Sequence, residues 1–308
     1  MPSESQSVPL NLRFSSTVVA GFQFPVLSSS CTLPLPAAKP KIHAEVGRYR
    51  LRLAESVEER EAACRLRFEV FNIELREGLQ SSYETGLDID QFDPACDHLL
   101  VEDKQDWRVV GTYRMQSGAT AAANFGYYSE QEFNLSAYEP LRSGILELGR
   151  ASIDREHRTP EVLTLLWRGI AQYASNMNLR YLLGCSSINS KDPADGWRMY
   201  RELERYRVPP EFATEPMPGY ACPAASDEAG NKPLSEIEST SRLVLDALRV
   251  SSEVKVPKLL RTYLAIGCRI GGPPAWDRDF GTIDFLTFLD LKLVTSSVRN
   301  RFLAPLSK

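Results

Sequence analysis

Several features that assign a protein to a common class are missing from these 308 residues. No run approaches the ~18 consecutive apolar residues of a membrane-spanning helix, and no basic segment followed by a compact apolar stretch opens the first 40 residues. The six cysteines never form a C-x-x-C pair, so the sequence predicts neither a zinc site nor a thiol–disulfide motif. The net charge is only −4, which gives no general attraction to nucleic acid. We therefore expect a cytoplasmic protein with reduced thiols and without a signal peptide, a metal ion or a nucleic-acid partner.

The N-terminal segment differs in composition from the rest of the chain. Residues 1 to 40 contain eight serines, six prolines and three charged side chains, a composition typical of disorder. We predict a disordered extension over residues 1–46 and one folded domain over residues 47–300, in which 43% hydrophobic residues suffice for a substantial core. Residues 207–236, with six prolines, are expected to form an insertion, and residues 257–296 a helix and a strand.

Hydrophobic periodicity predicts an α/β (α+β) domain without the regular βαβ repeat of a doubly wound sheet. Ser56 and Glu59 form the S-x-x-E signature of a capped helix, and Thr159 followed by Pro160 marks another helix start. The expected strands cover residues 48–53, 98–102, 108–115, 145–153, 181–186 and 283–291, and the expected helices begin near residues 57, 160, 193 and 257.

The most informative stretch is L-E-L-G-R-A-S-I at residues 146–153, which leads into a capped helix. In a flat strand Glu147 and Arg150, three residues apart, point to opposite faces, but Gly149 between them is a position where a β-bulge can re-aim one side chain. A carboxylate beside such an irregularity is a candidate general base. A carboxylate that merely pairs with Arg150 at a strand edge is the alternative.

Arg155, Arg158 and Thr159 surround the start of the following helix. The free amides and the dipole at a helix N-terminus favour an anion, so these residues are candidates for a phosphate site. Two surface arginines beside an ordinary capped helix are the alternative interpretation.

Two further motifs suggest other chemistry. His98 and Asp103 form H-x-x-x-x-D, the acid–base pair of glycerolipid acyltransferases, but His98 begins an apolar strand and no accompanying glycerolipid motif follows. Cys185 in G-C-S-S lacks the G-x-S-x-G arrangement of a nucleophile elbow, which favours a buried structural thiol.

Six patches carry a resemblance to a known superfamily. Over residues 49–296 the chain resembles the acyltransferase branch of the GNAT superfamily, in particular the ornithine-lipid N-acyltransferases, often labelled hemolysin-like, and the acyl-homoserine-lactone synthases. The patches at 126–135 and 259–286 favour the ornithine-lipid branch. The six are R-L-R-F-E-V-F-N-I-E at 65–74, D-I-D-Q-F-D at 88–93, V-G-T-Y-R-M at 110–115, G-Y-Y-S-E-Q-E-F-N-L at 126–135, E-L-G-R at 147–150, and L-L-R-T-Y-L-A-I-G-C-R-I-G-G-P-P-A-W-D-R-D-F-G-T-I-D-F-L at 259–286.

This resemblance implies a GNAT-like fold, in which a mixed, mostly antiparallel sheet is flanked by helices and two central strands splay apart to admit a pantetheine arm. It implies transfer of a (3-hydroxy)fatty acyl group to the α-amine of an amino acid, by default ornithine, with Glu147 as general base and Arg150 beside it. The alternatives are an acyl-homoserine-lactone-type signal synthase and a non-catalytic acyl-binding or membrane-active, hemolysin-like protein.

The donor implied by the resemblance is acyl-phosphopantetheine on acyl carrier protein, and no tightly bound cofactor is expected. The usual superfamily phosphate loop, Arg or Gln followed by G-x-G, is replaced here by R-T-P-E-V-L, which weakens the case for coenzyme A. Lys255, Lys258 and Arg261 share one helix face, and with Arg155 and Arg158 they are suited to dock the carrier or to touch anionic lipid at the inner membrane face. A solvated basic face is the alternative.

The resemblance also assigns a charged cluster and a substrate cleft. The alternating signs of the cluster indicate a buried ion-pair network, which can equally be architectural. For Asp90 and Asp93, loop capping competes with binding of a cationic amino acid. The positions that match the cluster and cleft of acyl-homoserine-lactone synthases are Arg67, Phe71, Asp90, Asp93, Arg114, Glu147 and Arg150.

Three aromatic residues, Tyr127, Tyr128 and Phe133, are expected to line an acyl tunnel. Aromatic side chains more commonly fill a core, so core packing is the alternative for these residues and for Phe71.

Overall fold

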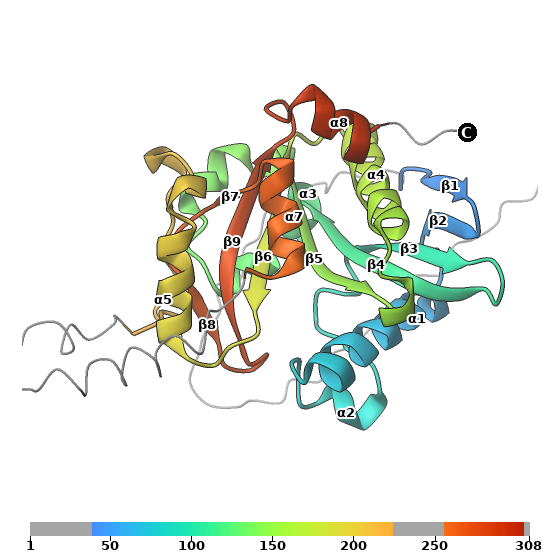
Figure 1. The fold of residues 1–308 in the computed structure, drawn as a ribbon, viewed down its shortest axis with the longest axis horizontal. Helices are drawn as coiled ribbons and strands as arrows, with labels where there is room; N and C mark the ends of the chain where they lie inside the picture. The colour runs from blue at the N-terminus through green and yellow to red at the C-terminus, as the bar shows by residue number, and fades with distance from the viewer. Residues whose placement is uncertain (1–38, 224–255, 305–308) are drawn as a thin grey trace, which may run out of the picture. The chain divides into compact units, whose positions relative to one another are not determined.

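The computed structural model describes residues 39–223 and 256–304. The strands of this part form one sheet in the order β1-β2-β3-β4-β5-β6-β9-β7, with β8 also paired to β9 (Figure 1). Neighbouring strands are antiparallel except β5 and β6, which run parallel. The mixed, mostly antiparallel sheet that the sequence predicts is therefore confirmed. The strands are β1 (His43–Val46), β2 (Tyr49–Leu53), β3 (Asp97–Asp103), β4 (Arg108–Ser117), β5 (Ile145–Ile153), β6 (Tyr181–Ile188), β7 (Arg269–Ile270), β8 (Ala275–Asp277) and β9 (Thr282–Asp290).

The helices begin where the sequence places their caps. The Ser56 hydroxyl accepts the Glu59 amide and the Glu59 carboxylate accepts the Ser56 amide, so the capping box is present, and the Thr159 hydroxyl accepts an amide of the first turn of α4. The α-helices are α1 (Val57–Phe68), α2 (Ser82–Thr85), α3 (Gly118–Ala123), α4 (Pro160–Asn176), α5 (Pro193–Glu202), α7 (Lys258–Ile266) and α8 (Ser296–Phe302). Between them lie the π-helical segment η1 (Glu69–Leu75) and the 3-10 turns η2 (Tyr128–Gln131), η3 (Ser136–Gly144), η4 (Arg155–His157), η5 (Glu204–Tyr206) and η6 (Pro210–Phe212).

The folded domain begins earlier than predicted. Residues 43–46 were expected to be disordered, but they form β1, which pairs with β2 from His43↔Arg52 to Val46↔Tyr49. The prediction of disorder is therefore wrong for residues 43–46. The part of the predicted extension before residue 39 lies outside the described residues. At the other end α8 runs past residue 300 to Phe302.

The described part of the predicted insertion, residues 207–223, packs against the sheet and the η2 region. Backbone bridges join Pro216 to Phe133 and Ala221 to Ala275. The rest of the insertion, from residue 224, lies outside the described residues.

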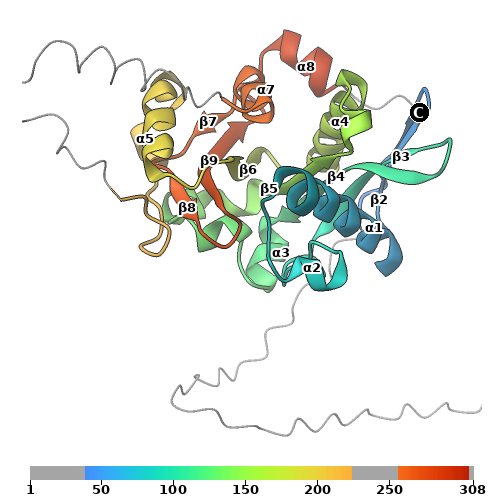
Figure 2. The same cartoon turned by 60° about the horizontal axis from the view of Figure 1, so that its bottom comes forward.

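Alternation along the strands sorts the helices onto two faces of the sheet. Leu99 and Val101 of β3 pack in the main core with Trp167 of α4, whereas Leu100 packs with Ala63 of α1. Figure 2 shows α4 and α7 on one side of the sheet and α1 on the other. The two faces of the sheet are therefore covered by different helices.

Across the described ranges, no helix has both the length and the apolar composition required to traverse a bilayer. The described cysteines are free thiols at positions 64, 96, 185, 222 and 268. Burial raises the pKa of Cys64 and of Cys96 to about 12, so both thiols stay protonated.

Candidate active site

Two neighbouring central strands separate partway along their length. β5 and β6 pair only from Ile145↔Tyr181 to Glu147↔Leu183, although both strands continue well beyond these residues. Gly184 lies at the point of separation, where a Cβ would overlap the carbonyl oxygen of Leu148. Among the described strands, none pairs with this edge of β5 beyond Glu147. The structure thus contains the splayed strand pair that the sequence predicts, and we call it the fork.

A cavity of about 750 Å³ occupies the fork and is lined by residues from both faces of the sheet. Leu182 and Leu183, successive β6 residues that belong to cores on opposite faces, both line it. On the α4 face the walls are mainly apolar, with Trp167 and Tyr263 in contact at 5.7 Å between ring centroids. The fork therefore joins an apolar compartment to a polar one. The polar walls on the opposite face include Gln116, Ser129, Glu147, Asp277 and Asp284.

Glu147 lies at the fork on the polar face. It is 5% exposed and lines the cavity. Its Oε1 accepts hydrogen bonds from the amide and the hydroxyl of Ser129 (2.8 and 2.7 Å), and its Oε2 accepts one from the amide of Tyr128 (2.9 Å). A carboxylate offers about four acceptor positions, so one remains for a substrate proton. Burial raises the pKa of Glu147 and the three hydrogen bonds lower it, with a net rise above the ordinary value.

The predicted bulge in β5 is present, one residue later than predicted. The register of β5 against β4 shifts between Thr112↔Ser152 and Arg114↔Gly149, and Arg150 rather than Gly149 adopts the left-handed backbone conformation, with φ +53°. An extra residue in one strand re-aims the side chains that follow it. Arg150 consequently lines the cavity, and it does not pair with Glu147, so the strand-edge ion pair considered above is not formed.

Three arginines and three aspartates form a buried ion-pair network that joins α1, the loop before β3, β4 and β5. Each arginine contacts two of the aspartates and each aspartate two of the arginines, so the six charges balance in a closed arrangement, which we call the charge ring. The sequence predicts every member except Asp88. The contacts are Arg67–Asp88 at 2.7 Å, Arg67–Asp93 at 2.6 Å, Arg114–Asp93 at 3.4 Å, Arg114–Asp90 at 2.6 Å, Arg150–Asp90 at 3.1 Å and Arg150–Asp88 at 3.4 Å.

Within the charge ring, Arg67, Asp90 and Asp93 have a structural role. Arg67 is 0% exposed, and none of the three lines the cavity. Both aspartates are held by two arginine partners each, and a cationic amino acid in the cavity would not touch them. Asp90 also accepts the amide of Phe92 at 2.9 Å, the loop cap considered above. We therefore correct the predicted substrate contact of these three residues to a structural one, whereas Arg114 and Arg150 reach the cavity.

Tyr127 and Phe133 do not reach the cavity either. Both are buried in a second core cluster together with Ile145, and the Tyr127 hydroxyl donates to the carbonyl of Arg142 at 3.2 Å. Tyr127 and Phe133 were predicted to line an acyl tunnel, with core packing as the alternative. The structure places both in the core.

Tyr128 and Phe71, by contrast, line the cavity, and their contact with a substrate stays a prediction. The wide turns of η1 follow directly on α1 and present Phe71 to Phe280, 5.4 Å away between ring centroids. The guanidinium of Arg150 lies over the rings of Tyr128 and Phe280, at 4.8 and 4.6 Å from their centroids. These aromatic rings hold the arginine at the cavity wall.

The start of α4 borders the cavity through Arg158 and Thr159. Arg158 forms a bidentate ion pair with Glu74: its two terminal guanidinium nitrogens donate to the two carboxylate oxygens, at 2.5 and 2.6 Å. Arg155 is exposed and does not line the cavity, so the structure brings two of the three predicted phosphate-site residues to it.

Two other cations line the same cavity. Lys258 is one of the basic residues singled out in the sequence, whereas Arg301 of α8 was missed. Within residues 39–223 and 256–304, neither forms an ion pair. Arg261 is exposed, and Lys255 lies outside the described residues.

Neither alternative motif assembles a second catalytic centre. His98 is buried with Nε2 3.1 Å from the carbonyl oxygen of Asp93, while Asp103 pairs with Arg48, and neither lines the cavity. Cys185 does line it, with Sγ 3.5 Å from the Ser129 hydroxyl, but burial raises the pKa of its thiol well above the ordinary value.

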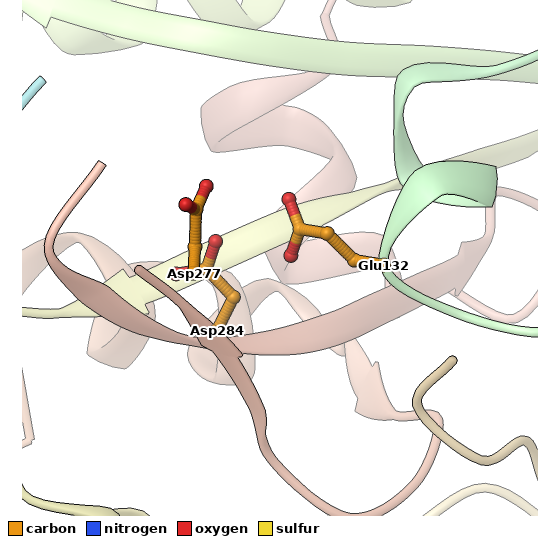
Figure 3. Close-up of side chains that lie close together, drawn as sticks. All are labelled: Glu132, Asp277 and Asp284. Atoms are coloured by element: carbon orange, nitrogen blue, oxygen red, sulfur yellow. The ribbon is translucent and has the colours of Figure 1, made fainter. Parts of the chain in front are cut away.

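Three carboxylates that the sequence analysis did not identify meet at the polar compartment (Figure 3). Glu132, Asp277 and Asp284 are buried, and each offers an oxygen within 4.8 Å of the others. Asp277 and Asp284 line the cavity. We call this group the acidic triad. Because Glu132 is remote in sequence from the other two, no spacing motif indicates the triad.

Comparison with known proteins found a matching family model and several similar curated relatives. Residues 66–168 match the model of the Acetyltransferase (GNAT) domain. An L-ornithine N(alpha)-acyltransferase of Agrobacterium fabrum is 28% identical over 271 residues, which cover 85% of this chain and 86% of the relative. Another from Brucella abortus is 29% identical over 268 residues, which cover 83% of this chain and 89% of the relative.

Solved structures of low similarity were also found. The acyl-homoserine-lactone synthase LasI matches with a TM-score of 0.43 and 12% identity, covering 84% of this chain and 98% of LasI. FeeM, an N-acyl amino acid synthase from uncultured soil microbes, matches with a TM-score of 0.43 and 12% identity, covering 84% of this chain and 97% of FeeM.

Proposed function

We propose that this chain, in which residues 66–168 match the model of the Acetyltransferase (GNAT) domain, transfers a long, 3-hydroxylated fatty acyl group from a pantetheine thioester to the α-amine of ornithine. The observation that carries the proposal is the fork, where Glu147 lines a cavity that joins an apolar compartment to a polar one. The curated relatives, named L-ornithine N(alpha)-acyltransferases, supply the acceptor. The product would be an N-acylated amino acid with lipid character.

The chemistry requires a nucleophilic amine, a positioned carbonyl and a proton acceptor. In the proposed reaction the amine nitrogen attacks the thioester carbonyl, the C–N bond forms and the C–S bond then breaks. Glu147 accepts the proton from the amine, directly or through water, and the pantetheine sulfur leaves and is protonated to the thiol. No covalent intermediate on the protein is needed.

The surroundings of Glu147 support this role. The pKa of Glu147 is raised, which brings it closer to the pKa of an effective general base. The hydrogen bonds from Tyr128 and Ser129 hold the carboxylate in one orientation. The re-aimed Arg150 is the residue that we assign to hold the acceptor next to it, because its guanidinium lies at the cavity wall over two aromatic rings.

We infer that acyl carrier protein, rather than coenzyme A, presents the acyl group. A phosphopantetheine arm on a carrier protein has one phosphate, fewer than coenzyme A. The start of α4, with Arg158 and Thr159 at the cavity, offers a site for one phosphate. Lys258 and Arg301, which form no ion pair with the residues that the structure describes, line the same cavity and suit an acidic carrier. The same positive charge suits brief contact with anionic lipid as the product leaves.

The proposal is tested by mass spectrometry of lipids from a bacterial host that makes no N-acylated amino acids. Cells that express this chain are expected to accumulate acylated ornithine, and cells that express Glu147→Gln are expected to lack it. The exposed Glu211 provides a matched control, because Glu211→Gln removes the same charge at a residue that does not line the cavity and should leave the product in place.

Two results would overturn the proposal. Accumulation of acylated homoserine lactones instead would identify a signal synthase. Lipid and lactone profiles identical to those of the empty host, with the folded protein present, would leave a non-catalytic acyl-binding protein as the better account.

A further inference from the structure

The charge ring and the acidic triad each contain three largely buried carboxylates, and the two groups differ in their counter-charges. Every aspartate of the charge ring contacts two arginines. By contrast, no member of the acidic triad forms an ion pair with any residue in the described part of the chain. A buried ionised carboxylate without a partner is costly, so such groups are paired, neutralised by protons or bound to a cation that arrives from outside.

The triad is built from two separate parts of the fold. Asp277 and Asp284 share one face of the β8/β9 hairpin, because Ala275 pairs with Asp284 and Asp277 pairs with Thr282. Glu132 follows η2 and is fixed from both sides by its backbone: its amide donates to Ser129 (3.2 Å) and its carbonyl accepts from Met217 (2.7 Å). Figure 3 shows its carboxylate pointing toward the two aspartates.

Glu132 is the observation that indicates a ligand. It is 1% exposed, and neither of its carboxylate oxygens nor Oδ1 of Asp284 receives a hydrogen bond from an amide, hydroxyl or cationic donor of the described residues; the Glu132 and Asp284 carboxyls face each other within hydrogen-bonding reach. Buried polar atoms in native proteins nearly always have partners, so unpartnered atoms aimed at one another indicate a missing donor. Burial, followed by the neighbouring Asp284 and Asp277, raises the pKa of Glu132 well above its ordinary value.

The triad is also connected to the proposed reaction centre. Glu147 binds the amides of Tyr128 and Ser129, and the same turn continues into Glu132. Asp277 and Asp284 line the cavity that Glu147 lines. A cation bound by the triad would therefore lie in the same compartment as the amine that is to be acylated.

We propose that the acidic triad binds the side-chain ammonium of the acceptor, and so selects amino acids that carry a primary amine at the end of the side chain. This inference rests on the proposed function and names the residues that set its acceptor class.

The chemistry of an ammonium group matches the triad. An ammonium has three N–H donors and no acceptor, and three carboxylates from three chain positions can each receive one. The three ligand oxygens all lie within 4.8 Å of one another, close enough for one small cation to contact all three. The rings of Phe280 and Tyr128 line the cavity beside it and suit the methylene groups of such a side chain.

The test compares ornithine with norvaline, which has the same carbon chain without the terminal amine. With purified full-length protein, wild type is expected to prefer ornithine by at least about 100-fold in kcat/KM, because norvaline leaves the carboxylates without a donor. Glu132→Gln is expected to reduce this preference by about 10- to 100-fold, and Asp284→Asn provides a second variant. Each substitution removes one carboxylate from the acidic triad and so reduces the repulsion among its members, and neither should lower the Tm. Glu211→Gln should keep the wild-type preference.

A binding measurement separates this inference from the proposed function. Ornithine should raise the Tm of wild type more than norvaline does, and Glu132→Gln should abolish the difference, whether or not turnover is observed. If wild type acylates no amino acid but shows this Tm pattern, the proposed function fails and the cation site stands. An unchanged ornithine preference in both variants would overturn the inference. So would transfer that is abolished by EDTA and restored by Mg²⁺, which would make the triad a metal site.

Discussion

Asp93 and Asp284 are both buried aspartates, and their neighbours push their pKa values in opposite directions. Although burial alone would raise it, the guanidiniums of Arg67 and Arg114 hold the pKa of Asp93 far below its usual range. Burial raises the pKa of Asp284, which has no arginine partner among the described residues. One aspartate therefore serves as a permanent structural charge, and the other can exchange a proton for a cation.

His98 makes a testable contribution to stability at the residue scale. Burial lowers its pKa from 6.5 to about 4, so the folded protein keeps His98 neutral while the unfolded chain binds a proton below pH 6.5. Since the unfolded state then binds more protons, acidification from pH 7 to pH 5 should lower the free energy of unfolding by about 2 kcal/mol through this residue. The loss should be complete only below pH 4, once the folded protein also binds the proton. Urea unfolding of wild type and His98→Gln at both pH values measures it.

The variant removes the contributions of other groups from this comparison. The raised pKa values of Glu147, Glu132 and Asp284 act in the opposite direction, since acid favours the folded protein there, but they are common to both proteins. The difference between the two pH dependences should therefore report His98 alone. Equal pH dependence of wild type and variant would show that the buried imidazole is not held neutral.

The residue scale also shows where sequence reasoning is limited. Glu147 and Arg150 were identified from E-L-G-R and both line the cavity. Tyr127 and Tyr128 are adjacent and chemically identical, but one fills the core and the other lines the cavity. Only the course of the backbone through η2 decides between them, and no composition or spacing rule contains that information.

At the scale of elements, local signals were reliable where they were strong. β5 has the predicted bounds, and the caps at Ser56 and Thr159 are as predicted, because periodicity and capping are encoded within a few residues. The bulge falls at Arg150 rather than Gly149, since strand register and not glycine content fixes it. β7 and β8 were missed because strands of two and three residues carry too little periodicity. The acidic triad depends on tertiary pairing and was beyond any local rule.

The fork itself can be tested through Gly184. A methyl group at this position would overlap the carbonyl oxygen of Leu148, so Gly184→Ala must displace β6 relative to β5 where they separate. Overpacking of this kind is expected to lower the free energy of unfolding by about 1–3 kcal/mol. Misplacing the reacting groups by about 1 Å should lower acyl transfer by about 100-fold. Urea unfolding and a transfer assay on the purified variant measure the two effects.

Gly219 supplies the matched control for this substitution. It is exposed, and an added Cβ would meet nothing within 4 Å, so Gly219→Ala should leave both stability and transfer near the wild-type values. If Gly184→Ala behaved like Gly219→Ala, the close approach of the two strands would have no part in forming the site.

At the scale of the whole described domain, the sheet separates two kinds of environment. The α4 face supplies apolar walls, and the opposite face supplies Glu147, Arg150 and the acidic triad. The charge ring ties α1 and the loop before β3 to β4 and β5, and so fixes the polar face around the opening. A fatty thioester and a charged amino acid can thus approach one point from different sides of the same sheet.

The central claim is that an acyl thioester lies in the fork with its carbonyl beside Glu147, and a crystal structure with a stable acyl-pantetheine analogue and ornithine tests it most directly. We predict that the pantetheine arm runs between β5 and β6, with the acyl chain against Trp167 and the α-amine of ornithine within hydrogen-bonding distance of Glu147. An analogue bound outside the fork, with Glu147 out of reach of either ligand, would contradict the account.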